Sequence, residues 1–411
     1  MKFRFRDYQT TIINSSINIL NQHKFVYLAM EVRTGKTLTS LGICQNMDAK
    51  SVLFVTKKKA ISFIQKDYDL LNPSFDIEII NYESLHKVRK RCDFLILDEA
   101  HCMGKLQKPS KRSQMVKNLV ATQKPYVILM SGTPTPENFS QIYHQIYMCP
   151  GNPFREHTSF YKFAREYINV TEKKFNGLIV RDYTGGKREI MEKMKPYMIS
   201  FSQKQAGFKV ETTEQILTVQ MQEQTYDIAQ RLKKDRVVEG KDEVILGDTP
   251  IKLMTKLHQI YSGTIKFESG ATQILDLSKG EFIKKFFHNK KIGIFYKYKA
   301  ELDVLKKVFK DNLTTNLEEF KDAKNKSIAL QIQSGREGIS LKEADCLVYY
   351  NIDYSATSYW QSRDRMTTKY TKENKLYWIF SNKGIEKKIY KAVINKRDYT
   401  TSIFKKEFLT L

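Results

Sequence analysis

Cysteine is scarce in this chain, and the few cysteines form no recognisable pattern. The 411 residues contain Cys44, Cys92, Cys102, Cys149 and Cys346, an odd number that lie far apart. Their spacing matches no metal-ligand motif. We therefore expect ordinary thiols in a reducing compartment.

Long apolar segments are also missing. The longest runs, such as Phe94–Leu97 and Val127–Met130, suit buried strands and are too short to cross a bilayer. The first seven residues, MKFRFRD, lack the apolar stretch of a secretory signal, so we expect a cytoplasmic protein. No internal repeat or low-complexity tract is visible.

Acidic residues are outnumbered by basic ones. The 45 Asp and Glu face 69 Lys and Arg, which gives a formal net charge of +24 and favours a polyanionic partner. Nucleic acid is the first candidate, and a membrane surface is set aside for want of an apolar span. With 41% apolar residues over this length, we expect two to three folded domains.

The first 150 residues alternate between two patterns. Short apolar runs typical of buried parallel strands occur at Phe25–Met30, Val52–Val55, Phe94–Leu97 and Val127–Met130. Helical patterns at Gln9–Leu20 and Thr37–Met47 lie between them. Residues 1–150 are therefore predicted to form one α/β domain, which ends near Cys149–Pro153.

The rest of the chain is predicted to form two further parts. In 151–270 the strand pattern fades and helical stretches such as Gln222–Lys234 and Ile251–Tyr261 dominate, so we expect a helical linker or insertion. In 271–411 buried-strand runs return, with amphipathic Lys299–Phe309 between the first two, and a second α/β domain is predicted. The runs are Ile292–Tyr296, Ile328–Ile332 and Leu347–Asn351.

A phosphate-binding loop is predicted after the first strand. Gly35, Lys36 and Thr37 follow an apolar run and open a helix, so backbone amides can hold phosphates while Lys36 neutralises charge and Thr37 binds Mg²⁺. Met30 stands where the full motif has Gly. The alternative is a simple Gly turn before a helix.

Two further motifs follow buried runs. Asp98 and Glu99 end a strand, where Asp98 is predicted to hold Mg²⁺ and Glu99 to orient or deprotonate the attacking water. Ser131–Pro134 follows the next run, and its hydroxyls are candidates for sensing the nucleotide. A plain strand-to-loop turn is the alternative for that segment.

Taken in order, these segments resemble a superfamily 2 helicase or translocase of the Swi/Snf-type branch, and more narrowly its small phage relatives with a DEAH box. The likeness extends from about Phe3 to about Asn395. It implies two tandem RecA-like parallel-sheet domains, ATP and Mg²⁺ as cofactors, and catalytic roles for Lys36, Asp98, Glu99 and Arg365.

The resemblance also assigns binding residues. It implies that ATP is held by Arg6, Gln9 as the adenine reader, Arg33, Thr34, Gly35, Lys36, Thr37, Gly338 and Gln361. It implies DNA-backbone contacts by Thr56, Lys57, Thr133, Gln333 and Arg336. Segments Tyr197–Phe201 and Gln224–Tyr226 are similar to the helical region typical of this branch.

One position departs from the family pattern. The arginine-finger motif usually has a second Arg three residues after the first, and here Thr368 follows Arg365 at that distance. Arg363 and Lys369 are candidates to replace it. An arginine finger contributes about 10³-fold or more to turnover, so this difference matters.

Three functions are compared. The first is an ATP-driven, monomeric translocase that remodels forked or branched DNA in recombination, repair or replication, in a bacterium or a phage-infected cell. The second is an RNA helicase. The third, which Thr368 motivates, is an ATP-gated nucleic-acid clamp with little turnover.

Overall fold

The structure is a computed structural model that describes residues 3–175, 178–209, 211–240, 243–335, 340–363, 365–366 and 373–395. The chain separates between Phe208 and Lys209 into two compact units, unit 1 and unit 2. In the described ranges, no helix is long and apolar enough to span a membrane.

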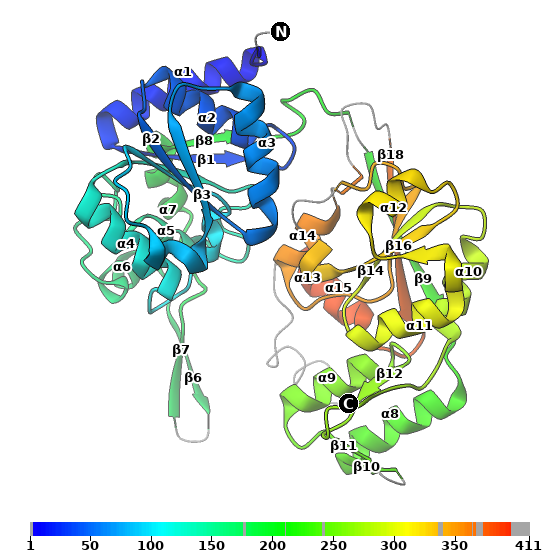
Figure 1. The fold of residues 1–411 in the computed structure, drawn as a ribbon. Helices are drawn as coiled ribbons and strands as arrows, with labels where there is room; N and C mark the ends of the chain where they lie inside the picture. Colours follow the sequence, from blue (N-terminus) through cyan, green and yellow to red (C-terminus); the bar gives the residue numbers. More distant parts are fainter. Residues whose placement is uncertain are drawn as a thin grey trace. The chain divides into compact units, whose positions relative to one another are not determined.

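Unit 1 is an α/β layer structure (Figure 1). Its helices and strands are α1 (Asp7–His23), β1 (Phe25–Met30), α2 (Lys36–Asn46), β2 (Ser51–Thr56), η1 (Lys58–Ala60), α3 (Ile61–Leu71), β3 (Asp76–Asn81), η2 (Tyr82–Lys87), β4 (Phe94–Leu97), η3 (Ala100–Met103), α4 (Lys111–Gln123), β5 (Tyr126–Met130), η4 (Phe139–Ile142), α5 (Tyr143–Ile146), α6 (Phe160–Tyr167), β6 (Thr171–Phe175), β7 (Leu178–Asp182), α7 (Glu189–Met194), η5 (Lys195–Tyr197) and β8 (Met198–Phe201). The described strands β3-β2-β4-β5-β1-β8 form one parallel sheet in that order. β6 and β7 form an antiparallel hairpin that projects away from it.

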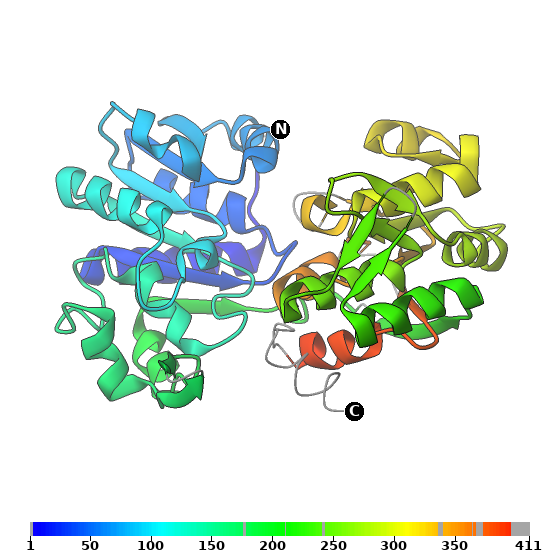
Figure 2. The same cartoon turned by 90° about the horizontal axis from the view of Figure 1, so that it is seen from below.

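The strands of unit 1 bury both faces of the sheet. In β1, Phe25 and Tyr27 join one hydrophobic cluster with α4 to α7, whereas Val26 and Leu28 join another with α1 to α3. Side chains alternate along a strand, so a run that is apolar at every position needs cover on both faces. Helices lie on both faces, as Figures 1 and 2 show.

Unit 2 repeats this architecture with a different sheet. Its elements are β9 (Glu211–Val219), α8 (Glu223–Asp235), β10 (Val237–Glu239), β11 (Val244–Leu246), α9 (Pro250–Ile260), β12 (Thr264–Lys266), β13 (Thr272–Ile274), α10 (Ser278–Phe286), β14 (Ile292–Tyr296), α11 (Lys299–Phe309), η6 (Lys310–Asn312), β15 (Leu313–Thr314), α12 (Leu317–Asp322), β16 (Ser327–Gln331), α13 (Ile332–Gly335), β17 (Cys346–Tyr349), α14 (Ala356–Arg363), β18 (Glu373–Ser381) and α15 (Glu386–Ile394). The described strands β15-β16-β14-β17-β18-β9 form a parallel sheet. β10–β11 and β12–β13 are small antiparallel pairs.

The predicted fold class, two tandem parallel-sheet α/β domains of RecA-like type, is confirmed. Segment 151–270 contains helices α6 to α9, but it also supplies β8 to the sheet of unit 1 and β9 to that of unit 2. Met198–Phe201, expected in a helical region, is therefore a strand. The three-part division at 150 and 270 stays a prediction, beside the single separation at Phe208.

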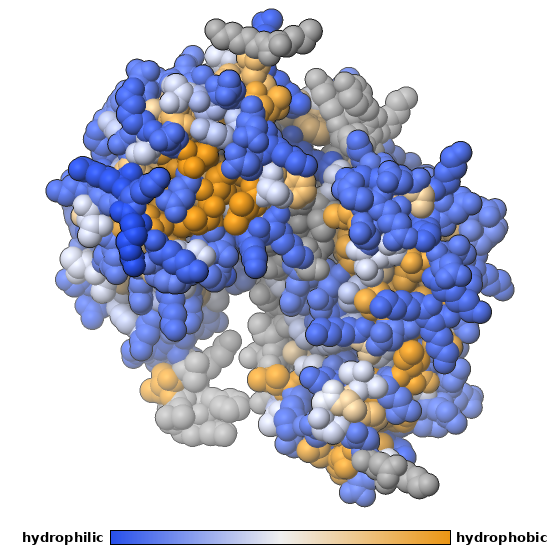
Figure 3. All heavy atoms as spheres, in the orientation of Figure 1, coloured by the Kyte–Doolittle hydropathy of each residue, from blue (hydrophilic) through white to orange (hydrophobic). Residues whose placement is uncertain are grey.

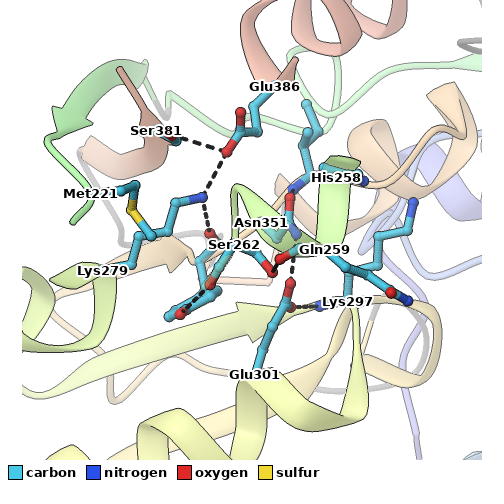
Figure 4. A network of polar contacts seen from close by, with 12 residues as sticks. Met221, His258, Gln259, Ser262, Lys279, Lys297, Glu301, Asn351, Ser381 and Glu386 are labelled. Atoms are coloured by element: carbon cyan, nitrogen blue, oxygen red, sulfur yellow. Dashed lines mark hydrogen bonds and ion pairs between the residues drawn. The ribbon is translucent and has the colours of Figure 1, made fainter. Parts of the chain in front are cut away.

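A buried polar network holds the helices of unit 2 against its sheet (Figure 4). Lys279 of α10 and Glu386 of α15 form a fully buried ion pair, with Nζ 2.7 Å from Oε1. The backbone amide of Ser381 donates to the same carboxylate at 3.2 Å. Beside this pair, Asn351 donates to Glu301 at 2.5 Å. Separating the two helices would leave an uncompensated buried charge on each. The ion pair therefore holds α10 against α15.

His258 of α9 makes the stability of unit 2 dependent on pH. Its Nδ1 lies 3.1 Å from the Tyr298 hydroxyl and 3.0 Å from that of Tyr354. Burial, together with the charges of Lys297 and Lys279, lowers the pKa of His258 well below its usual value, while Asn351 opposes the shift. The folded protein therefore keeps the imidazole neutral, whereas the unfolded chain protonates it below about pH 6.5.

Acidification should consequently destabilise unit 2. We expect this histidine to remove about 2 kcal/mol of unfolding free energy between about pH 6.5 and pH 5, and His258→Gln to abolish that share. Both tryptophans, Trp360 and Trp378, lie in unit 2. Their fluorescence during urea unfolding therefore reports this unit. An identical pH slope in the variant and the wild type would contradict the assignment.

Candidate nucleotide and nucleic-acid site

The predicted motifs of unit 1 meet at one edge of its sheet. Strands β4, β5 and β1 are consecutive neighbours, and β2 lies on the other side of β4, all parallel. Since parallel strands end at the same edge, the segments that follow them come together. These segments carry Gly35–Thr37 after β1, Thr56 and Lys57 at β2, Asp98 and Glu99 after β4, and Ser131–Thr133 after β5.

The loop after β1 needs glycine at position 35. Gly35 has φ of 81°, in the left-handed region, and directly precedes α2. A Cβ there would lie 2.6 Å from Nε2 of Gln9, so Gln9 would have to move, and the left-handed backbone itself would be strained with a side chain. The backbone amides at the start of α2 therefore remain accessible to an anion.

The first turn of α1 holds this loop. Gln9 is buried, and its amide donates to the Gly35 carbonyl and the Thr39 hydroxyl, both at 3.3 Å. Tyr8 donates to the Thr34 carbonyl at 3.1 Å, and Arg6 donates to the Tyr8 hydroxyl at 2.8 Å. The fold thus brings Arg6 and Gln9 to the loop, which lies more than 20 residues away in the sequence, as predicted. Their roles toward ATP remain predictions.

Lys36 lies over the loop itself. Its Nζ donates to the Met30 carbonyl at 2.9 Å and to the Glu31 carbonyl at 3.1 Å. The Thr34 hydroxyl donates to the Glu31 carbonyl at 2.7 Å, which closes the turn. Thr37 and Arg33 are half-buried in the same segment. The ammonium group is therefore already positioned by loop carbonyls at the expected phosphate site.

The acidic pair is held in a buried setting. The Thr56 hydroxyl donates to Oδ2 of Asp98 at 2.8 Å, and the Glu99 amide donates to Oδ1 at 2.9 Å. Burial and the charge of Glu99 raise the pKa of Asp98 to about 6, whereas Thr56 and Lys36 oppose the shift. A carboxylate whose ionised form is disfavoured in this way is suited to a cation, which would stabilise its charge.

A chain of contacts joins the acidic pair to the loop after β5. His101 places Nδ1 3.2 Å from Oε2 of Glu99 and 3.0 Å from the Ser131 hydroxyl. Ser131 in turn accepts from the Thr133 amide at 3.0 Å. Oγ1 of Thr133 is buried, and the described residues offer it no hydrogen-bond partner. Glu99 and Ser131–Thr133 are therefore physically connected through His101.

Thr56 should act on metal binding through Asp98. Thr56→Val removes the hydroxyl that supports ionised Asp98, so we expect the Mg²⁺ concentration for half-maximal ATP hydrolysis to rise about tenfold. Thr56→Ser keeps the hydroxyl and should stay near wild type. A Mg²⁺ titration of ATPase rates measures this, and equal curves for the two variants would refute it. The predicted DNA contact of fully buried Thr56 stays a prediction, as does that of half-buried Lys57.

Two residues that support the site belong to no recognisable sequence motif. Gln203 lies just after β8. Its backbone amide donates to Oε2 of Glu31 at 2.7 Å, and its side chain donates to the Val32 carbonyl at 3.0 Å. Buried Tyr82 donates to the Asp98 carbonyl at 2.7 Å. Both contacts join distant segments, and no local pattern announces them.

The predicted residues of unit 2 are only partly described. Arg365 is 8% exposed, and its carbonyl accepts from the Leu341 amide at 2.8 Å. Gln333 is exposed in α13, and Gln361 belongs to α14. Arg336, Gly338, Thr368 and Lys369 lie outside the described residues.

Arg363 has a structural partner. Its Nη2 lies 2.5 Å from Oε1 of Glu214 in β9, and both side chains are mostly buried. Tyr359, Trp378 and Tyr390 donate to the same carboxylate at 2.9 to 3.0 Å. Arg363 therefore fixes α14 to β9 and β18, which argues against it as a substitute for the second arginine.

A second contact fixes the other end of α14. Lys297, directly after β14, pairs with Asp353 at 3.1 Å, and Asp353 accepts from the Ser358 hydroxyl at 2.8 Å. Burial opposes ionisation, but Lys297 and Ser358 hold the pKa of Asp353 below its ordinary value. Lys297 also lines a cavity of about 410 Å³ with Tyr298 and Gln331. The helix that precedes Arg365 is thus anchored at both ends.

Comparison with known proteins assigns the family. Residues 35–265, more than half of the chain, match the SNF2-related domain, and residues 278–367 match the helicase conserved C-terminal domain. No curated protein matches the chain.

Two solved structures from Sulfolobus solfataricus are similar, each at 14% identity. The SWI2/SNF2 ATPase core in complex with dsDNA has a TM-score of 0.44, covering 100% of this chain and 94% of that one. The SWI2/SNF2 ATPase core domain has a TM-score of 0.42, covering 99% and 91%. On the family match, the chain belongs to the SNF2-related family of superfamily 2 and is an ATP hydrolase.

Proposed function

We propose that this chain is an ATP-driven motor that translocates on DNA and remodels forked or branched DNA. The observation that supports it most directly is the convergence of Lys36, Asp98, Glu99 and Ser131 at one edge of the sheet of unit 1. The excess of basic side chains suits a sequence-independent grip on a phosphate backbone. Remodelling, rather than processive unwinding, is the finer part of the proposal.

The residues present fit ATP and Mg²⁺. Gly35, the amides that open α2 and Lys36 supply donors for phosphate oxygens. Asp98 and Thr37 supply the oxygen ligands that Mg²⁺ prefers. No group of three or more His, Cys, Asp or Glu gathers within the described ranges, so waters and phosphate oxygens would complete the coordination. Bound there, Mg²⁺ would neutralise charge on the phosphates.

The protein groups then divide the work. Lys36 neutralises phosphate charge, and Glu99 orients and deprotonates the attacking water. His101 relays the state of Glu99 to Ser131 and so to the predicted DNA contact at Thr133. In the proposed cycle Arg365 of unit 2 stabilises charge on the phosphates as an arginine finger, so hydrolysis requires residues of both units.

ATP hydrolysis by wild type and Lys36→Ala tests this function. Rates are compared without nucleic acid and with single-stranded DNA, duplex DNA, a four-way junction and RNA. Stimulation by duplex or junction DNA that Lys36→Ala abolishes supports the motor, and stronger stimulation by the junction supports remodelling. Stimulation by RNA alone would overturn the choice of substrate.

A clamp with little turnover is the second candidate. Arg363 is engaged with Glu214, which leaves fewer arginines near α14 to replace the missing second finger. Under this reading ATP changes DNA affinity while hydrolysis stays near background. Strong DNA-stimulated turnover eliminates it. Action as a monomer, in a bacterium or a phage-infected cell, belongs to the main proposal.

A further inference from the structure

A basic groove lies on unit 2 between α10 and α11, away from every segment assigned to a motif. It has a volume of about 570 Å³ and is lined by Leu277, Glu281, Lys284, Lys285, His288, Lys307 and Val308. None of these residues belongs to the nucleotide loop, the acidic pair or the segments after β14, β16 and β17. The motor mechanism proposed above therefore makes no use of this groove.

The packing of the two helices fixes the groove. Gly280 of α10 faces α11, where an added Cβ would meet Val304 at 3.0 Å and Val308 at 3.1 Å, so a side chain there would require these valines to shift slightly. Lys284 of α10 donates to the Val308 carbonyl of α11 at 2.8 Å, which adds a hydrogen bond between the two helices. The groove is thus a permanent feature of two packed helices.

Its charge is not balanced locally. Residues 281–310 contain nine lysines and three acidic residues, so this segment is strongly basic, as is the whole chain with its net charge of +24. Of those acids, Glu301 is fully buried in the network of Figure 4. Some lysines elsewhere in unit 2 are paired, as exposed Lys321 is with Glu318 and half-buried Lys326 is with Glu319. Lys285 and Lys307 are exposed and form no ion pair with another described residue.

The surface around the groove suits a phosphate backbone. Lysines stand on both walls, and the visible face over α10 and α11 is mostly hydrophilic (Figure 3). Duplex DNA presents one charge per about 1.7 Å of axis, so cations on two walls can contact several phosphates. An unneutralised basic groove favours this ligand over a peptide of mixed charge.

We infer that the α10–α11 groove is a second DNA-backbone site that holds an additional arm of branched DNA. The inference rests on the proposed function. Branched DNA has a further arm that could bind in the groove, whereas a linear duplex bound by the motor segments has none. A second contact would raise the affinity for a junction above that for a linear duplex through an increased local concentration.

Binding of the full chain to fluorescent DNA tests the inference. Anisotropy is measured without nucleotide for a four-way junction and a linear duplex over a range of salt. For Lys285→Gln/Lys307→Gln we expect about tenfold weaker junction binding, and a salt slope smaller by about 2. Binding of the linear duplex and duplex-stimulated ATP hydrolysis should stay at wild-type levels. The charge-preserving Lys285→Arg/Lys307→Arg should bind the junction normally.

Lys321→Gln/Lys326→Gln is the matched control, because it removes the same charge from the same unit outside the groove, at exposed Lys321 and half-buried Lys326. Equal loss in both glutamine variants, or no loss in the groove variant, overturns the inference. If wild type binds the junction but no DNA stimulates its ATPase, the proposed motor fails independently of the groove.

Discussion

Glu99→Gln is expected to lower DNA-stimulated ATP hydrolysis by about 10³-fold while ATP binding changes little. Glutamine keeps the shape of the side chain but cannot accept a proton from water. The charge of Glu99 also raises the pKa of Asp98, so its removal should favour ionised Asp98 and preserve metal binding. Single-turnover hydrolysis and fluorescent-nucleotide binding measure the two effects separately.

Glu83→Gln provides the matched control. Glu83 is an exposed glutamate of the same unit that pairs with Arg112, so its loss changes the same charge without touching the acidic pair. We expect near-normal turnover. If Glu99→Gln kept more than about a tenth of wild-type turnover, another group would have to act as the base.

Arg365→Ala is expected to reduce kcat by about 10³-fold with little change in ATP affinity or stability, as for loss of an arginine finger. Arg363→Ala should behave in the opposite way. It would leave Glu214 without its cation among Tyr359, Trp378 and Tyr390, so we expect about 2 kcal/mol lower unfolding free energy.

Comparing the two variants separates catalysis from support. Turnover is measured at saturating ATP and DNA, and urea unfolding is followed by the fluorescence of Trp360 and Trp378. A catalytic loss in Arg363→Ala without a loss of stability would reverse the assignment and make Arg363 the second finger. Near-normal turnover in Arg365→Ala would instead show that hydrolysis does not depend on Arg365.

Local sequence pattern was sufficient for the central strands. Phe25–Met30 and Phe94–Leu97 are β1 and β4 with the predicted bounds, and Lys299–Phe309 is α11. Central parallel strands are covered on both faces, so each appears as an uninterrupted apolar run. The segments after these strands could therefore be recognised, and the family match confirms the class of protein they indicate.

Edge strands lack that signal. β9, with the sequence ETTEQILTV, is mostly exposed or half-buried, and β8 is only four residues long. Neither contains a buried run long enough to stand out, so both were placed in a helical segment. Their strand character depends on pairing with β1 and β18, which lie far away in the sequence.

The sequence by itself determined the α/β class, the central strands, the order of the motifs and the positive charge that calls for a polyanion. Tertiary structure alone decided that β5 lies between β1 and β4, that Gln9 occupies the space beside Gly35, and that Arg363 is engaged with Glu214. The reason is physical. Burial and periodicity act on neighbouring residues and leave a local pattern, whereas strand order and side-chain partners depend on the path of the whole chain.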